Sequence, residues 1–152
     1  MARSPLTAAL LCAALTAFGD ASVPTPPQSA GKQAAPGKRI ALTAEQARTC
    51  HGDRHPYVTP STRDVQRLDA SLVEALRQIG SARRIVERVP GDTLFYTATK
   101  DGFIQVEGFC GHLAGSDRRC PPGVDDGGDC VWRIRYNVKT RQFDQFGTNG
   151  DG

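Results

Sequence analysis

Four cysteines that remain after an N-terminal leader are the feature that most limits how this chain can fold. Residues 1–21 combine Arg3, an apolar run over residues 6–18 and small residues at 19–21, a pattern typical of a secretory signal peptide. We expect cleavage after Ala21, with Gly19 as the alternative, and export to an oxidising compartment. An even number of cysteines there predicts two disulfides rather than reactive thiols. These cysteines are Cys50, Cys110, Cys120 and Cys130.

Two other interpretations of the leader are a membrane anchor and a lipoprotein attached through Cys12. The apolar run is shorter than the roughly 20 residues that span a bilayer, and no second such run follows. Leu11 precedes Cys12, whereas a lipidation site needs a small residue at that position. We therefore expect a periplasmic or secreted protein without a transmembrane segment.

The mature chain divides into a linker and one domain. Residues 22–38 are rich in Pro, Ser, Gly and Ala and hold too little apolar surface to form a core, so we expect a disordered linker. Residues 39–152 then form a single domain. A domain of this size buries only about two thirds of its unfolded surface, which makes disulfides important for its stability.

The charge of the chain gives weak guidance about partners. The net charge is +3, and the basic residues are scattered rather than gathered in one block. Such a balance permits attraction to an anionic envelope polymer. Nucleic acid is not expected as a partner of an exported protein.

The clearest predicted helix begins at about Pro60 or Thr62 and ends at Ile79. Its apolar residues recur at steps of three and four, Ser61 and Asp64 form a start signal, and Gly80 follows its last residue. A shorter helix is predicted from Thr43 to near Cys50, because Thr43 and Gln46 match a capping box. Residues 82–89 suit a helix or a strand, and the sequence does not decide between them. The apolar stripe of the 62–79 helix consists of Val65, Leu68, Leu72, Leu76 and Ile79.

The second half of the domain changes to an alternating pattern, which predicts strands. The expected strands cover residues 93–99, 103–110, 131–138 and 142–146, with a turn at residues 100–102 in which Gly102 takes a positive φ. Together these elements predict an α+β domain. In it, one N-terminal amphipathic helix packs on a three- to four-stranded antiparallel β-meander, and two disulfides staple the fold.

Strand pairing suggests how the cysteines combine. If the strand that ends at Cys110 pairs with the strand that starts near Cys130, these two cysteines face each other at the base of a long loop. Cys50 would then pair with Cys120. Four cysteines allow three pairings, however, and the sequence leaves all three open.

The C-terminal part also carries a resemblance. Residues 124–136 read Val-Asp-Asp-Gly-Gly-Asp-Cys-Val-Trp-Arg-Ile-Arg-Tyr, and Phe143 and an Asn149-Gly150 pair follow. Over residues 59–150 the chain resembles small exported bacterial proteins of uncharacterised function. The resemblance implies a bond between Cys110 and Cys130, and it implies no activity.

Two groups of residues suggest metal binding. The loop at residues 111–129 contains four aspartates among glycines and prolines, and carboxylates on a flexible backbone suit calcium. The loop lacks the EF-hand spacing, and turn chemistry explains the same residues. Cys50, His51, His55 and His112 suggest zinc or copper, but Pro56 disfavours the helix that would align His51 with His55. We expect no cofactor. The aspartates are Asp117, Asp125, Asp126 and Asp129.

The sequence offers little for catalysis. It contains no Gly-x-Ser-x-Gly elbow, no His-Glu-x-x-His and no phosphate-binding glycine loop. The pair Cys110 and His112 could supply a nucleophile, but a disulfide at Cys110 is expected instead. Glu107 and Asp101 could supply an acid and a base, although the alternation places both on an exposed edge or turn. We therefore expect a protein that is not an enzyme.

The leading hypothesis is an interaction module in the cell envelope, either an inhibitor or an adaptor. It would present Asp117, Arg118 and Arg119 of the 111–129 loop to an envelope or secreted protein, or to an anionic polymer. The alternative is a carrier of a small ligand or of calcium. That carrier would use Asp125, Asp126 and Asp129 of the same loop.

Overall fold

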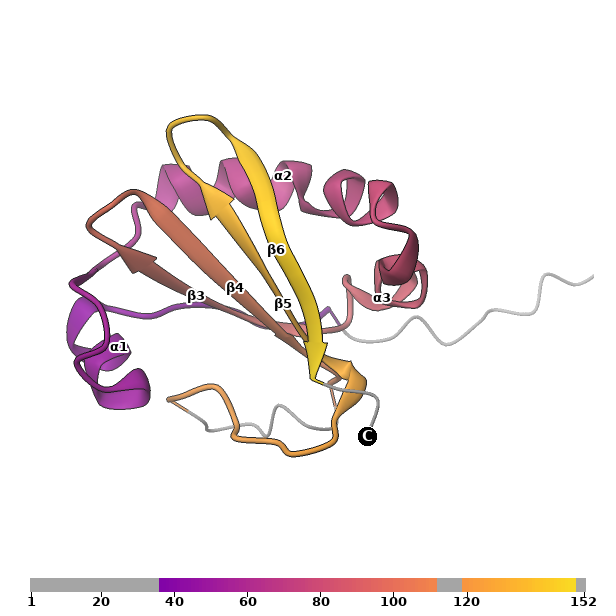
Figure 1. The fold of residues 1–152 in the computed structure, drawn as a ribbon, viewed down its shortest axis with the longest axis horizontal. Helices are drawn as coiled ribbons and strands as arrows, with labels where there is room; N and C mark the ends of the chain where they lie inside the picture. The colour runs from indigo at the N-terminus through magenta and orange to yellow at the C-terminus, as the bar shows by residue number, and fades with distance from the viewer. Residues whose placement is uncertain (1–35, 112–118, 150–152) are drawn as a thin grey trace, which may run out of the picture. The chain divides into compact units, whose positions relative to one another are not determined.

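The protein is described by a computed structural model that covers residues 36–111 and 119–149. The predicted signal peptide at residues 1–21 and the linker up to residue 35 lie outside the described residues. The order of elements confirms a mixed α+β domain (Figure 1). The elements are β1 (Arg39–Ala41), α1 (Ala44–His51), β2 (Tyr57–Val58), α2 (Thr62–Gln78), η1 (Gly80–Ala82), α3 (Arg83–Arg88), β3 (Thr93–Thr99), β4 (Phe103–Phe109), β5 (Gly128–Asn137) and β6 (Gln142–Asn149).

Helices α1 and α2 begin where their capping residues predict. At the start of α1, the hydroxyl of Thr43 accepts a hydrogen bond from the Gln46 backbone, and the Gln46 side chain accepts one from the Thr43 backbone. Ser61 caps α2 by accepting from the Asp64 backbone at 3.1 Å. Residues 82–89, for which the sequence allows a helix or a strand, are mostly helical, and most of them form α3.

The sheet has more strands than the sequence predicts. Its order is β1-β3-β4-β5-β6, and β2 also pairs with β3. Strands β3 to β6 are antiparallel neighbours, whereas β1 runs parallel to β3. The expected sheet of three to four strands is therefore wrong, and so is the N-terminal position expected for the amphipathic helix, because β1, α1 and β2 precede α2. Strands of three and two residues, such as β1 and β2, are too short to show an alternating pattern.

Two residues before the predicted domain boundary at residue 39 also form backbone hydrogen bonds with the domain. The Gly37 amide donates to the Pro90 carbonyl at 2.8 Å, and the Leu94 amide donates to the Lys38 carbonyl at 2.8 Å. A Cβ at position 37 would lie 1.9 Å from the Asp92 carbonyl oxygen, so only glycine fits this close approach. Gly37 and Lys38 therefore belong to the domain rather than to the linker.

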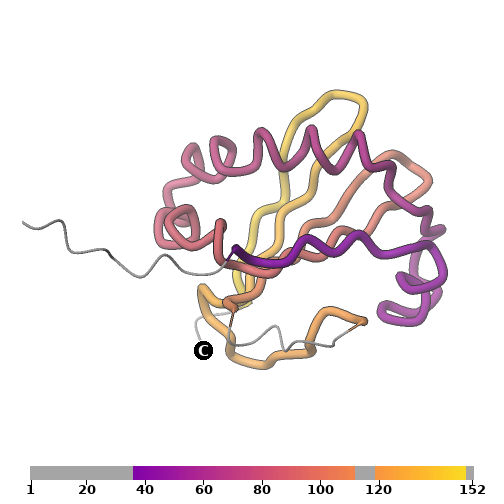
Figure 2. Tube along the Cα trace, turned by 180° about the vertical axis from the view of Figure 1, so that it is seen from behind, coloured from indigo at the N-terminus to yellow at the C-terminus, as the bar shows by residue number. Residues whose placement is uncertain are grey.

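The two faces of the sheet carry separate apolar clusters. Figure 2 shows, from behind, α2 crossing the strands. The larger cluster lies between the sheet and α2 with α3, and the smaller one lies near α1. Strand β3 contributes to both, and six of its seven residues are buried. The larger cluster includes Leu68, Leu72, Leu76, Ile85, Leu94, Tyr96, Val106, Trp132 and Ile134, and the smaller one consists of Leu42, Ala47, Tyr57, Phe95 and Phe109.

Trp132 anchors the larger cluster. Its side chain is 1% exposed, and its indole N–H donates to Oδ2 of the buried Asp92 at 3.1 Å. Gly108 is its direct partner on the neighbouring strand. A Cβ at position 108 would lie 2.0 Å from the indole ring, so glycine is required for the ring to lie against β4.

Both disulfides have the pairing that was favoured from the strand order. Cys110 is bonded to Cys130 next to the paired ends of β4 and β5. Cys50 in the last turn of α1 is bonded to Cys120. No helix within residues 36–111 and 119–149 is long and apolar enough to cross a membrane.

The contact between Gly108 and Trp132 gives a stability prediction. Gly108→Ala forces the indole ring or β4 to move, which should lower the free energy of unfolding by about 3 kcal/mol, at the upper end of overpacking costs. Gly123→Ala is the control, because nothing lies within 4 Å of a Cβ there. Urea unfolding of both variants measures the difference, and equal midpoints would contradict the packing described here.

Candidate functional site

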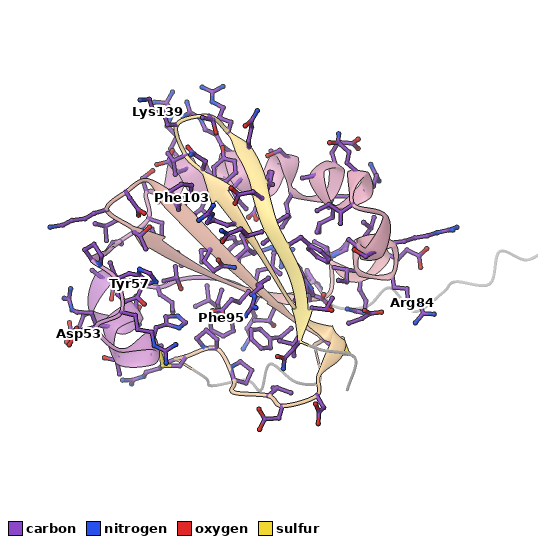
Figure 3. All side chains as sticks on the ribbon, in the orientation of Figure 1. Asp53, Tyr57, Arg84, Phe95, Phe103 and Lys139 are labelled. Atoms are coloured by element: carbon purple, nitrogen blue, oxygen red, sulfur yellow. A yellow bond between two sulfur atoms is a disulfide. The ribbon has the colours of Figure 1, made fainter. Side chains whose placement is uncertain are left out.

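One face of the sheet is only partly covered. On the side opposite α2, helix α1 and Tyr57 cover Phe95 and Phe109, and the rest of the face borders a cavity of about 700 Å³. Figure 3 labels Tyr57 next to α1 and Phe103 further along the sheet. The charged and amide side chains that line the cavity are His51, Arg54, His55, Asp101, Gln105, Glu107, Arg133, Arg135 and Gln145.

Strand register places the floor residues side by side. Glu107 on β4 lies opposite Phe95 on β3 and opposite Arg133 on β5, and Arg133 lies opposite Gly147 on β6. Directly opposed residues on antiparallel strands have Cβ atoms about 4.5–5.5 Å apart. A carboxylate and a guanidinium group are therefore neighbours in the centre of the open face.

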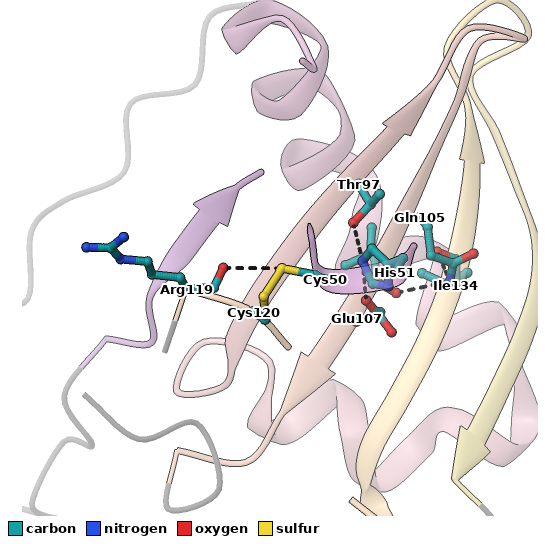
Figure 4. Close-up of polar contacts among 9 residues, drawn as sticks. Cys50, His51, Thr97, Gln105, Glu107, Arg119, Cys120 and Ile134 are labelled. Carbon is teal, nitrogen blue, oxygen red and sulfur yellow. Dashed lines mark hydrogen bonds and ion pairs between the residues drawn. A yellow bond between two sulfur atoms is a disulfide. The ribbon is translucent and has the colours of Figure 1, made fainter. Parts of the chain in front are cut away.

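His51 forms one wall of the site. It is the last residue of α1, and its Nε2 atom lies 3.2 Å from Thr97 Oγ1 and 3.8 Å from Glu107 Oε2 (Figure 4). The neighbouring residue, Cys50, is bonded to Cys120, so the disulfide holds this turn of α1 in place. The imidazole ring is consequently fixed above the boundary between β3 and β4.

Glu107 is a partly buried acid with unused bonding capacity. Its side chain is 25% exposed, yet its Oε2 atom is buried and has no hydrogen-bond partner. Burial raises the pKa of Glu107 above its ordinary value, and the charge of Arg133 opposes that rise. The sequence-based expectation that Glu107 is exposed is wrong. Alternation identifies its face of the strand, but it does not show that α1 overlies part of that face.

Burial has the opposite effect on the charge of His51. It lowers the pKa of the imidazole below its ordinary value, and the charge of Arg54 lowers it further. His51 is therefore mainly neutral near pH 7 and is not a strong cationic partner for Glu107.

The arginines at the cavity differ in their partners. Arg135 donates two hydrogen bonds to Asp144, at 2.7 and 2.8 Å, and its guanidinium carbon lies 4.3 Å from the centre of the Phe103 ring. Arg54 and Arg133, by contrast, form no hydrogen bond or ion pair with any residue in the described part of the chain. Two exposed guanidinium groups are therefore available to a ligand.

The contacts of His51 differ from those of a catalytic triad. In a triad, the nucleophile and the acid contact opposite nitrogens of the ring. Here Thr97 and Glu107 both approach Nε2, so neither can orient the ring for the other. Cys110, which was considered as a nucleophile but expected to form a disulfide, is bonded to Cys130, and His112 lies outside the described residues. Asp101 lies in an exposed turn, as the sequence predicts.

The loop aspartates that were considered as calcium ligands are not brought together. Asp125 and Asp126 are exposed, and Asp129 Oδ2 lies 3.8 Å from Arg84. Asp117 and Arg118 lie outside the described residues, and Arg119 is exposed. Across residues 36–111 and 119–149, no group of three or more His, Cys, Asp or Glu side chains could hold a metal ion.

The histidine site considered for zinc or copper is not formed either. Cys50 is bonded to Cys120, so its sulfur is not a free thiolate ligand. His51 ends α1, and His55 lies beyond that helix, so they do not share one helical face. His55 instead packs edge-on to the ring of Tyr57, with the ring centres 6.0 Å apart.

Comparison with known proteins adds no relative. No family model, no curated protein and no solved structure matches this chain. The resemblance to small exported bacterial proteins therefore stays a prediction. The site is interpreted from its own residues and their geometry.

The buried acid predicts how stability depends on pH. The pKa of Glu107 is raised above 4.5 in the folded state, so folding takes up a proton just above pH 4.5 and stability falls as pH rises through this window. Glu107→Gln removes that fall. The variant should be more stable than the wild type at pH 7, and the gap should close below pH 4.5.

Urea unfolding from about pH 3 to about pH 8 measures this effect. Glu74→Gln is the matched control, because the Glu74 side chain is 62% exposed on α2. A Glu107→Gln variant that follows the wild type at every pH would show that this carboxylate is hydrated like a surface group.

Proposed function

We propose that this chain is a non-catalytic binding module of the cell envelope or the extracellular space, and that it binds a small polar ligand in the cavity beside α1. One observation carries the proposal. A buried carboxylate oxygen without a hydrogen-bond partner and two unpaired guanidinium groups line the same cavity. Buried polar atoms are normally paired, so an unpaired one beside an opening is a candidate ligand contact.

The size and stiffness of the cavity support this proposal. A volume of about 700 Å³ lies within the range of roughly 300–1,000 Å³ that ligand pockets occupy. The floor is a hydrogen-bonded sheet, and the wall at His51 is next to a disulfide. A pocket that is already formed loses little conformational entropy when a ligand binds.

The disulfides support the proposed location. Cys50–Cys120 and Cys110–Cys130 would be reduced in most cytosols, and they persist in oxidising compartments. The predicted signal peptide at residues 1–21 agrees with export.

A second candidate is the interaction module that uses the loop before β5. Cys120 and Cys130 fasten this segment to α1 and to β4, which limits its motion. Asp125 and Asp126 are exposed between these two anchors. Such a loop could dock on an envelope or secreted protein as an inhibitor or adaptor does. It uses a surface that does not include the cavity, so one experiment can separate the two candidates.

Fragment screening by NMR tests which surface binds. The probe is a library of small polar fragments added to the ¹⁵N-labelled, oxidised mature protein. We expect the largest amide shifts at residues that border the cavity, including Thr97, Gln105, Glu107, Arg133 and Gly147. Shifts confined to residues 119–130 would favour the loop, and the absence of any cluster of shifts would contradict the proposed cavity function.

A further inference from the structure

We infer that the cavity binds a free α-amino acid, with its ammonium group at Glu107 and its carboxylate at Arg133. This inference rests on the proposed function, and it adds the chemical class of the ligand. It follows from the way in which two opposite charges are placed on the sheet without neutralising each other.

Glu107 and Arg133 are direct partners in the register of β4 and β5. Opposite charges in this arrangement commonly attract each other across the strands. Here no ion pair joins them, and Arg133 influences Glu107 only through its charge. Glu107 Oε2 lacks a hydrogen-bond donor, and Arg133 lacks an acceptor among the described residues. Glu107 can therefore still accept hydrogen bonds, and the neighbouring Arg133 can still donate them.

A ligand with one kind of charge satisfies only half of this pair. A simple anion would bind Arg133 and leave the buried oxygen of Glu107 without a donor. A simple cation would bind Glu107 but would also meet repulsion from Arg133 and Arg54, which line the same cavity. A zwitterion satisfies both groups, because its ammonium donates to Glu107 and its carboxylate accepts from the planar fork of Arg133.

The other groups at the cavity favour this orientation. Arg54 adds a second unpaired guanidinium group near His51, which attracts the carboxylate end of a ligand. His51 is mainly neutral near pH 7 and lies near Thr97. It therefore does not neutralise the charge of Glu107, which can pair with the ammonium group of the ligand. Arg135 is already paired with Asp144 and does not compete for the carboxylate.

The placement of the two charges on directly opposed residues of neighbouring strands favours a free amino acid over a peptide. An α-amino acid carries its ammonium and its carboxylate on one carbon atom, which matches adjacent positions on neighbouring strands. In a peptide, the two termini are separated by at least one peptide unit, so one group loses its partner. An acidic peptide would bind through Arg54 and Arg133 alone and would not need Glu107.

Isothermal titration calorimetry of the oxidised mature protein tests the inference. The probes are the twenty standard amino acids, each added alone, together with the N-acetyl derivative and the carboxamide of every one that binds. We expect at least one amino acid to bind. Both derivatives should then bind roughly tenfold more weakly or worse, because each loses one charge-assisted contact.

Variants assign the two ends of the ligand. Glu107→Gln and Arg133→Gln should each weaken binding roughly tenfold or more, while Arg133→Lys, which keeps the charge but loses the fork, should have an intermediate effect. Glu74→Gln on the outer surface of α2 should bind like the wild type. Amide spectra of each variant confirm that it is folded.

Three results would overturn the inference. These are no binding by any amino acid, equally tight binding of the N-acetyl derivative, and full affinity in Glu107→Gln. If polar fragments still shift the cavity amides while amino acids do not bind, the inference fails and the proposed binding function stands. If neither fragments nor amino acids bind in the cavity, both fail.

Discussion

The burial of β3 on both faces is the constraint on which the rest of the structure depends. Six of its seven residues are buried, so the chain must cover the sheet on two sides at this strand. Helix α2 covers one side, and α1 covers the other. A helix of eight residues is about 12 Å long and about 10–12 Å wide, whereas strands lie about 4.8 Å apart. Helix α1 is therefore too small to cover the whole of β4 and the neighbouring β5 and β6 as well, and the cavity lies over the part that stays open.

The position of α1 depends on more than its packing. Ala47 is its only fully buried residue, so hydrophobic contacts hold this helix weakly. The capping box at Thr43 fixes its start, and the Cys50–Cys120 disulfide fixes its last turn. The two cysteines are 70 residues apart in the sequence. A crosslink that closes a loop of this length strongly reduces the conformational entropy of the unfolded chain. The disulfide thus contributes both to stability and to the placement of His51 beside Glu107.

Local patterns predict the parts of the fold that local interactions decide. The apolar stripe of α2 and its cap at Ser61 predict the bounds of that helix to within about two residues. The alternating pattern of residues 103–109 predicts strand β4. Strands β1 and β2 are missed because their hydrogen bonds to β3 come from a distant part of the chain. The exposure of Glu107 is misjudged for the same reason, since the helix that overlies its face is more than fifty residues away. The site could be suspected only from the mixture of aromatic and charged residues on one face of β4.

The most direct measurement is an NMR titration of the Glu107 carboxyl and the His51 imidazole in the oxidised wild-type protein. The account predicts that the pKa of Glu107 lies above 4.5, that the pKa of His51 lies below 6.5, and that each titration shifts the signal of the other group. Ordinary pKa values for both groups, without mutual shifts, would contradict it. They would show that His51 and Glu107 are hydrated separately and that α1 does not form a wall over this face of the sheet.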